Sequence, residues 1–404
     1  MPAGANVGRR RQPRRTPPRP GVRERRSYSD QVRSVVHANT TRRARGARER
    51  GCRRRRRLRA GGILRRRAAG DRRERDDGRR RRRGRDRVDR DRDRGVSVDH
   101  RVGRRDTQLR SERTARSGSG FVAGDGYVVT NQHVVAGATE VKLRFQDNTW
   151  YDAEIVGTDA YSDLAVLRAE TRPEWATPLS WVDTDPEPPV GTHVMAIGSP
   201  YGFSGSASTG IISGVDRVLS APNNFTVADS VQTDAALNPG NSGGPLVTDD
   251  GAVAAVAARG GGDNLGFGVS AELSKRVVPE LAETGEYRHP YMGVRLVEVS
   301  PVIAEAYDID DVGGVLIVEV VEDGPAAGAL RGTDGSTSVD GVSVPTGGDV
   351  IVGIGGTDVE VQADLSNYLA LEASPGESVT FTVLRDGSET TVSFELGERP
   401  DPGI

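Results

Sequence analysis

The sequence predicts a mainly β protein with two folded domains behind a basic, disordered leader. Three observations support this. The composition changes near Arg116, short β-prone runs separated by turns follow it, and one amphipathic helix divides these runs into two groups. A chain of 404 residues is long enough for two or three domains. We expect a leader over 1–116, domains over 117–286 and 287–398, and a tail over 399–404.

The leader is set apart by its charge. Residues 1–116 contain 43 Arg, no Lys and 14 acidic residues, which gives a net charge of +29. Such a segment cannot bury enough apolar surface to fold alone. Two origins stay open: a genuine arm for nucleic acid or an acidic surface, or a frame-shift or start-site artefact of a GC-rich gene. The absence of Lys favours the artefact. Residues 107–116 are polar and carry no convincing strand pattern.

The rest of the chain is acidic. Residues 117–404 contain 13 basic and 43 acidic residues, a net charge of −30. Self-repulsion of this size weakens the compact state at low salt. Molar salt shortens the range of the repulsion to about 3 Å. We therefore predict a halophilic protein; the alternative is an acidic surface for a basic partner.

The first domain is predicted to be an all-β barrel structure. Asp250-Gly251 lies between two apolar runs, which is a signal for a tight hairpin. The regular spacing of short strands and turns favours a barrel over a sheet with crossover helices. The other β-prone runs centre on Val141, Leu143 and Phe145; Ala153, Ile155 and Val156; Val194, Ala196 and Ile197; and Ile211, Ile212 and Val215.

One helix is expected to close this domain. Ser270 can cap its N-terminus, with Glu272 in the first turn, and Gly285 follows its end. Its apolar face consists of Leu273, Val277, Val278 and Leu281.

The second domain is predicted to be α+β. A helix is expected from Ala363 to Leu371, and a turn at Asp386-Gly387 joins two strands. The apolar residues that alternate along these strands are Val379, Phe381 and Val383, then Val392, Phe394 and Leu396.

A candidate nucleophile lies in the segment from Gly240 to Pro245, which reads Gly-Asn-Ser-Gly-Gly-Pro. Ser242 has small neighbours, which let a substrate carbonyl approach. Such a serine needs a base and an orienting acid. His133 follows a short β-prone run, and Asp163 precedes another. Alone, each would be a structural residue, but the order His, Asp, Ser is one of three known for this geometry.

The three residues predict acyl transfer. His133 would accept the hydroxyl proton of Ser242 and pass it to the leaving amine, while Asp163 would hold the imidazole in the required tautomer. By position, the backbone N–H groups of Gly240 and Ser242 are the candidate donors of an oxyanion hole.

These residues resemble the HtrA (DegP-like) branch of the chymotrypsin-fold serine proteases, from about Ser117 to Glu398. The resemblance implies a chymotrypsin-like double β-barrel, an ATP-independent endopeptidase that degrades unfolded or damaged proteins, and a homotrimer. It also implies a β-strand just before Gly118, which we expect to be missing here because residues 107–116 are polar. The matching phrases are Gly118 to Phe121, Thr130 to Val135, Asp163 to Leu167, and Thr233 to Leu246.

The resemblance also suggests a specificity pocket. The residue six before the nucleophile lies near the pocket floor in such enzymes, and here it is Ala236. An acid there would select Arg or Lys, so Ala236 favours a small apolar side chain. Residues 257–262 would form a wall, in which Arg259 has no assigned role. We interpret Asp234 as a structural turn acid rather than a specificity acid.

The second domain resembles an HtrA-type PDZ domain, the alternative being a generic small α+β domain. Tyr291, Met292, Gly293 and Val294 match its carboxylate-binding loop. Such a loop binds peptide C-termini, and the peptide adds a strand to the sheet edge.

Several classes of site are not predicted. Cys52 is the single cysteine, so no internal disulfide is possible. The histidines His37, His100, His193 and His289 are scattered, and we interpret them as structural or surface residues. We expect no metal and no cofactor. No run approaches the roughly 18 apolar residues of a membrane span, and no signal core is visible, although the family works in the cell envelope or outside the cell.

Two rival functions are kept. The chain could be a catalytically silent holdase or PDZ peptide-binding scaffold, which the intact His133, Asp163 and Ser242 argue against. Nucleic-acid binding through the leader would depend steeply on salt, and a protein adapted to high salt could not sustain it.

Overall fold

The computed structural model describes residues 95–101, 115–199, 205–220, 225–262, 264–309 and 313–402. All of them belong to one compact unit that runs from Arg72 to Ile404. The predicted disorder of the Arg runs lies outside the described residues, as do Cys52 and His37.

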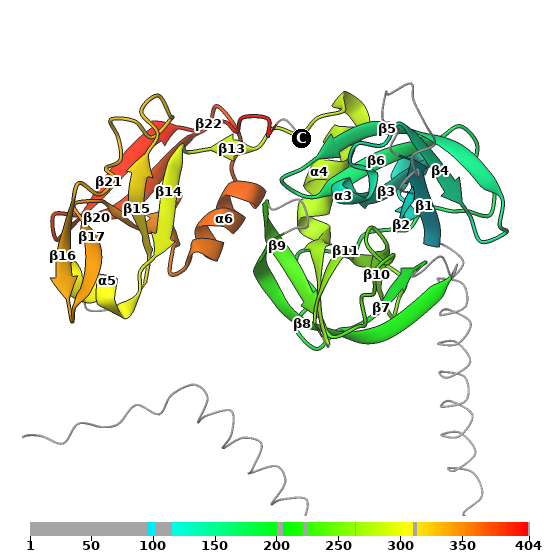
Figure 1. Ribbon diagram of the computed structural model, residues 1–404, viewed down its shortest axis with the longest axis horizontal. Helices are drawn as coiled ribbons and strands as arrows, with labels where there is room; N and C mark the ends of the chain where they lie inside the picture. Colours follow the sequence, from blue (N-terminus) through cyan, green and yellow to red (C-terminus); the bar gives the residue numbers. More distant parts are fainter. Residues whose placement is uncertain are drawn as a thin grey trace, which may run out of the picture. The chain divides into compact units, whose positions relative to one another are not determined.

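The first barrel is closed by six antiparallel strands in the order β1-β2-β3-β6-β5-β4 (Figure 1). Val98, Leu143 and Leu167 are fully buried in its core. The strands are β1 (Gly95–Arg101), β2 (Ala115–Val122), β3 (Tyr127–Asn131), β4 (Glu140–Arg144), β5 (Trp150–Asp159) and β6 (Leu164–Ala169).

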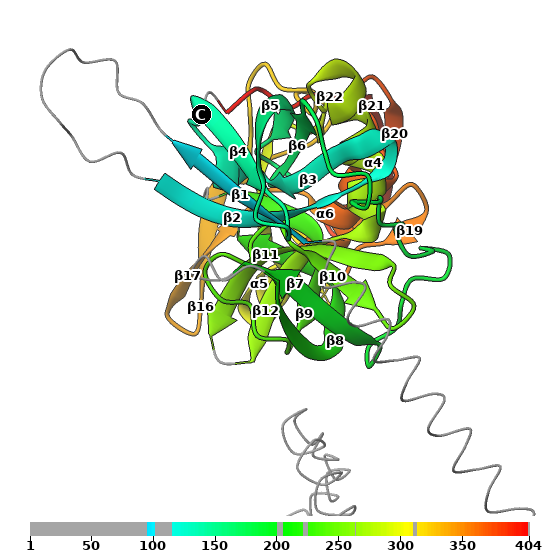
Figure 2. The same cartoon turned by 90° about the vertical axis from the view of Figure 1, so that its right-hand side faces the viewer.

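Strand β1 lies inside the expected leader, at Gly95–Arg101. The folded domain therefore begins before residue 117, and the expectation of a missing strand is wrong. Strand β1 pairs with β2 along its whole length and with β4, so it closes the barrel (Figure 2). Val96 and Val98 are buried in the core, and Ser97 between them is buried against the second barrel. The sequence concealed this strand because the period-two signal covers only three residues within a strongly charged run.

The second barrel has the strand order β10-β11-β12-β9-β8-β7. The predicted strands around residues 141–145, 153–156, 194–197 and 211–215 all form, and the hairpin at Asp250-Gly251 joins β10 to β11, which confirms the mainly β double barrel. The strands are β7 (His193–Gly198), β8 (Ser206–Ser220), β9 (Thr226–Thr233), β10 (Pro245–Thr248), β11 (Val253–Gly262) and β12 (Leu265–Ser270).

Helix α4 (Ala271–Thr284) confirms the predicted closing helix. The Ser270 hydroxyl accepts a hydrogen bond from the Leu273 N–H at 3.0 Å, and Gly285 ends the helix at φ +86°. The predicted apolar face is buried in a cluster that includes Leu164 and Val166 of β6 and residues of both barrels.

The second domain contains a sheet in the order β14-β15-β18-β20-β21, with β19 paired to β18. The predicted turn at Asp386-Gly387 joins β20 to β21, and α6 begins one residue before the predicted helix. The elements are β13 (Pro290–Tyr291), β14 (Val294–Glu298), α5 (Pro301–Ala306), β15 (Val315–Val320), β16 (Gly335–Val339), β17 (Val342–Thr346), β18 (Val350–Ile354), β19 (Thr357–Asp358), α6 (Gln362–Leu371), β20 (Ser378–Arg385), β21 (Ser388–Glu395) and β22 (Gly397–Glu398).

A buried acid lies where β9 meets α4. Asp229 is 2% exposed and accepts a hydrogen bond from the Ser270 hydroxyl, and its N–H donates to Asn367 Oδ1 of α6 at 2.8 Å. Burial, together with the charges of Glu272 and Asp216, raises the pKa of Asp229 to about 6, although the Ser270 hydrogen bond acts against the rise. Burial and the charge of Asp229 likewise raise the pKa of Glu187 to about 7.

We predict that Asp229→Asn makes the free energy of unfolding depend less on pH. The raised pKa means that the folded state binds this proton more tightly, so the wild type gains stability as the pH falls through about 6 toward the ordinary value of 3.8. The cost of ionisation above pH 6, up to about 3 kcal/mol, is absent from the variant. Asn keeps a side-chain acceptor for Ser270.

Urea unfolding at pH 8 and pH 5 measures this effect. The stability difference between the two pH values should shrink in Asp229→Asn and persist in Glu174→Gln, which changes an exposed acid. An unchanged difference in Asp229→Asn would show that this carboxyl is not a source of the pH dependence.

Candidate active site

His133 lies at the end of the first barrel's third strand. Strand β3 leads directly into a short helix, α3 (Gln132–Val135). Val134 and Val135 of this helix are buried, which fixes its orientation, and the His133 side chain stays 19% exposed. The imidazole is therefore held by packed neighbours and remains open to a reactant.

Asp163 lies in the turn between β5 and β6 and has a left-handed backbone with φ +56°. Its carbonyl accepts hydrogen bonds from the Gln132 N–H at 3.0 Å and from Asn131 Nδ2 at 2.9 Å. Its carboxylate lies 2.8 Å from His133 Nδ1 through Oδ2 and accepts from the His133 N–H at 3.0 Å through Oδ1. The buried carboxylate thus fixes Nδ1 as the protonated nitrogen and leaves Nε2 to act as a base.

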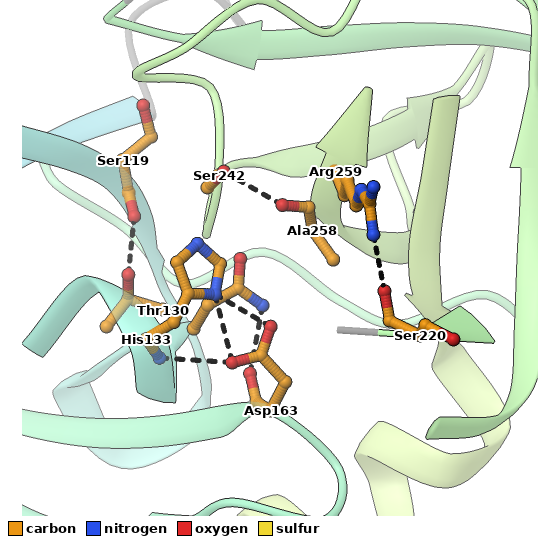
Figure 3. A network of polar contacts seen from close by, with 9 residues as sticks. Ser119, Thr130, His133, Asp163, Ser220, Ser242, Ala258 and Arg259 are labelled. Atoms are coloured by element: carbon orange, nitrogen blue, oxygen red, sulfur yellow. Dashed lines mark hydrogen bonds and ion pairs between the residues drawn. The ribbon is translucent and has the colours of Figure 1, made fainter. Parts of the chain in front are cut away.

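The Ser242 side chain lies on the other side of the imidazole from Asp163 (Figure 3). Its hydroxyl donates a hydrogen bond to the carbonyl of Ala258 in β11 at 2.8 Å. Among the described residues, no hydrogen bond joins this hydroxyl to His133. A rotation of the serine side chain is the step that would bring the hydroxyl to Nε2.

The loop around Ser242 leaves two amides unused. The N–H of Asn241 donates to Asn238 O, that of Gly243 to Ala257 O, and that of Gly244 to Asn241 O. Within the described part of the chain, the N–H groups of Gly240 and Ser242 have no such acceptor. Gly240 has φ +102°, a backbone conformation that residues with a side chain rarely adopt. Two free amides beside a nucleophile are the arrangement that an oxyanion hole requires.

A second carboxylate supports the turn that carries Asp163. Asp159 is buried and accepts hydrogen bonds from the Tyr161 N–H at 3.1 Å and the Ser162 N–H at 3.0 Å. His289 Nε2 lies 2.8 Å from Asp159 Oδ2, so this histidine has a structural contact. Burial opposes ionisation of Asp159, but His289 and these N–H groups outweigh it and lower the pKa of this carboxyl.

Two family models match the chain. The trypsin-like peptidase domain matches residues 118–256, and the PDZ domain matches residues 290–396. A probable periplasmic serine endoprotease DegP-like of Ectopseudomonas mendocina (strain ymp) is 36% identical over 299 residues, which cover 72% of this chain and 59% of that protein. The chain belongs to the HtrA family of serine proteases.

Further comparisons agree with this membership. The DegP-like protein of Halomonas elongata is 35% identical over 300 residues. The solved structure of the HtrA-type protease AlgW with a tripeptide has a TM-score of 0.63 at 28% identity and covers 79% of this chain and 98% of that one. A serine endoprotease from Yersinia pestis has a TM-score of 0.54 at 25% identity, with 78% and 98% covered. The chain spans about three fifths of the length of the DegP-like relatives that it matches.

The residues of the predicted HtrA pocket lie beside the Ser242 loop. Ala236 is exposed, and its carbonyl accepts a hydrogen bond from the Ser208 hydroxyl at 2.8 Å. Asp234 accepts from the Ile211 N–H at 2.7 Å, the contact expected of a structural turn acid. Arg259 donates to the carbonyl of Ser220 at 2.9 Å, an interaction that the sequence did not indicate (Figure 3). The role of Ala236 stays a prediction.

The predicted carboxylate loop connects β13 to β14. Tyr291 ends β13, Met292 is buried at 4% exposure, Gly293 has φ +75°, and Val294 begins β14. Strand β14 is at the edge of its sheet, where an added strand could pair. A Cβ on Gly293 would lie 3.1 Å from Gly324 Cα, so the loop is closely packed. The peptide-binding role of these residues stays a prediction.

The described residues were also compared with the requirements of a metal site and of a membrane-spanning helix. Over the described residues, no cluster of three or more His, Cys, Asp or Glu is arranged to hold a metal ion. In the same part of the chain, no helix has the length and apolar character needed to cross a membrane.

Sequence reasoning missed two hydroxyl residues in this HtrA site. Thr130 Oγ1 donates to the carbonyl of Ser119 at 2.7 Å, and both side chains are fully buried (Figure 3). Both belong to motif phrases used for the resemblance, yet only their contacts reveal a role. Ser119 and Gly240 are 121 positions apart, so no local pattern could have linked them.

We predict that Gly240→Ala lowers kcat by about 10²- to 10³-fold, the usual loss for one oxyanion-hole donor. A Cβ is disfavoured at φ +102°, so the peptide should turn and carry the Gly240 N–H away. Steady-state cleavage of a peptide substrate measures kcat and KM.

Gly387→Ala is the matched control. Gly387 also has a positive φ, at +75°, but it lies in the β20–β21 turn, where a Cβ would meet no atom within 4 Å. Its kcat should match the wild type, whereas an unchanged kcat in Gly240→Ala would exclude Gly240 as an oxyanion donor.

Proposed function

We propose that this chain is an ATP-independent serine endopeptidase of the HtrA type that degrades unfolded or damaged proteins. The observation that carries the proposal is the side-by-side placement of Asp163, His133 and Ser242, with the Asp163 carboxylate 2.8 Å from His133 Nδ1. Family membership supports the same chemistry.

The proposed reaction begins when Ser242 leaves the Ala258 carbonyl and donates its hydroxyl to His133 Nε2. The oxygen then attacks the scissile carbonyl as His133 takes the proton, and Asp163 stabilises the imidazolium. The Gly240 and Ser242 amides receive the oxyanion. His133 protonates the leaving amine, and a water molecule then hydrolyses the acyl-enzyme by the same route.

The proposed substrates are peptides with a small apolar side chain before the scissile bond, because Ala236 places no charge near the pocket. The second domain is proposed to bind peptide C-termini through the loop Tyr291 to Val294 and the edge of β14. The AlgW structures, which contain a decapeptide or a tripeptide, support peptide binding in this family.

The proposed setting is the cell envelope, since the DegP-like relatives are named periplasmic. A homotrimer is proposed from the family resemblance alone. The net charge of −30 over residues 117–404 supports activity in high salt, where the repulsion between acids is screened.

We predict that a fluorophosphonate probe labels the full-length protein and that Ser242→Ala abolishes the labelling. The same substitution should lower the rate of casein cleavage by roughly 10⁶-fold, since the nucleophile is lost. Both assays should be run in low and in molar KCl, with higher activity and a higher Tm expected in molar salt.

The wild type without labelling or cleavage at any salt concentration would favour the holdase or scaffold instead. A Tm that does not rise with KCl would contradict the halophilic part of the proposal and leave the endopeptidase part standing.

We predict that the second domain binds a peptide with a free C-terminal carboxylate and not the same peptide with an amidated C-terminus. The backbone N–H groups of the loop would donate to the carboxylate, and a neutral amide loses these charge-assisted hydrogen bonds. Fluorescence anisotropy with a labelled apolar peptide measures the two Kd values. Equal Kd values would contradict the assignment of residues 291–294.

A further inference from the structure

Ser119 of β2 is bonded to both residues of the proposed oxyanion hole. Its N–H donates to the Ser242 carbonyl at 2.8 Å, and its hydroxyl donates to the Gly240 carbonyl at 2.6 Å. The residue is fully buried and belongs to the first barrel, whereas Gly240 and Ser242 belong to the loop before β10 of the second. One residue of the first barrel therefore binds the carbonyl groups of both residues whose N–H groups are the proposed oxyanion donors.

The Ser119 hydroxyl is itself held by Ser199, which is bonded in turn to Ser97. It accepts a hydrogen bond from the Ser199 N–H at 2.9 Å, and the Ser199 hydroxyl accepts one from the Ser97 hydroxyl at 2.6 Å. Ser97 and Ser199 are 3% and 4% exposed. We call this set, which runs from Ser97 through Ser199 and Ser119 to the Gly240 carbonyl, the serine chain.

These contacts fix the plane of one peptide bond. The peptide between Gly240 and Asn241 is bonded at its carbonyl to Ser119 and at its N–H to Asn238 O, at 2.9 Å. With that plane held, only the two torsion angles at the Gly240 Cα can redirect the Gly240 N–H, and one of them, φ, is +102°.

The backbone packs closely around Ser119. A Cβ on Gly198 would lie 2.9 Å from Ser119 Oγ, and a Cβ on Gly244 would lie 3.2 Å from Ser119 Cβ. Loss of the Ser119 hydroxyl would leave the Gly240 carbonyl without this donor and free to turn.

We propose that Ser119 is a positioning residue that holds the oxyanion loop in its reactive form, and that Ser97 and Ser199 hold Ser119. The inference rests on the proposed endopeptidase function and adds residues to its machinery. It also gives β1 a role beyond barrel closure, because Ser97 supplies the far end of the serine chain.

The test is Ser119→Ala in the full-length protein. We expect kcat to fall about 10- to 100-fold, less than the loss of a donor itself, with KM unchanged. Ser97→Ala, which is two contacts beyond Ser119, should lose no more than about fivefold, the usual effect of one hydrogen bond. Affinity for a peptide aldehyde, whose adduct places an oxyanion in the hole, should fall in parallel with kcat/KM.

Ser274→Ala is the matched control. Ser274 is also fully buried, on α4, and its hydroxyl has no hydrogen-bond partner among the described residues. Its kcat and aldehyde affinity should equal those of the wild type. Wild-type kcat in Ser119→Ala, or a loss of activity without a parallel loss of aldehyde affinity, would overturn the inference.

Hydrogen exchange separates this inference from the proposed function. Backbone amides of residues 238–244 should exchange faster in Ser119→Ala than in the wild type and Ser274→Ala, whether or not the enzyme turns over. If the fluorophosphonate probe fails to label the wild type, the proposed endopeptidase function is rejected. If the wild type is labelled but Ser119→Ala leaves the exchange of these amides unchanged, the role of the serine chain is rejected and the endopeptidase function stands.

Discussion

The active site depends on the bonds that join one barrel to the other. The first barrel carries His133 and Asp163, and the second carries Ser242, so no reactive geometry exists within either alone. The hydrogen bond from the Ser119 N–H to the Ser242 carbonyl spans this boundary directly. Thr130, three residues before His133, donates to the carbonyl of the same Ser119. The strand that leads to His133 and the loop that holds Ser242 are therefore positioned by one shared residue.

The sequence predicted those features whose signal is local. Helix α4 was predictable because Ser270, the apolar face and Gly285 all lie within one stretch, and the hairpins at Asp250-Gly251 and Asp386-Gly387 follow from turn chemistry. The candidate triad was predictable from motif and order, although its roles rest on the predictions above. Strand β1 was not predictable, because its period-two alternation of apolar and polar residues covers only three positions. The contacts of Ser119 with Gly240 and of Asp159 with His289 were not either, because they join residues more than 100 positions apart.

Buried charge is distributed unevenly around this framework. Asp159 has hydrogen bonds from two N–H groups and His289, so its ionised form is well supported. Asp229 has hydrogen bonds from the Ser270 hydroxyl and the Leu273 N–H but, among the described residues, no cationic partner, and its burial and acidic neighbours outweigh them, so its ionised form is disfavoured. Both acids are almost fully buried. The difference lies in the donors around each carboxylate and not in its depth, and the well-supported acid is the one next to the turn that carries Asp163.

Strand β1 also limits how far the chain can be shortened from its N-terminal side. Its residues pair in register with β2 and β4, and Ser97 reaches a partner in the other barrel. Because β1 lies between β2 and β4, a chain shortened to begin after Arg101 would leave these two strands without their shared partner and the first barrel open. The same truncation would remove Ser97 and with it the hydrogen bond to Ser199.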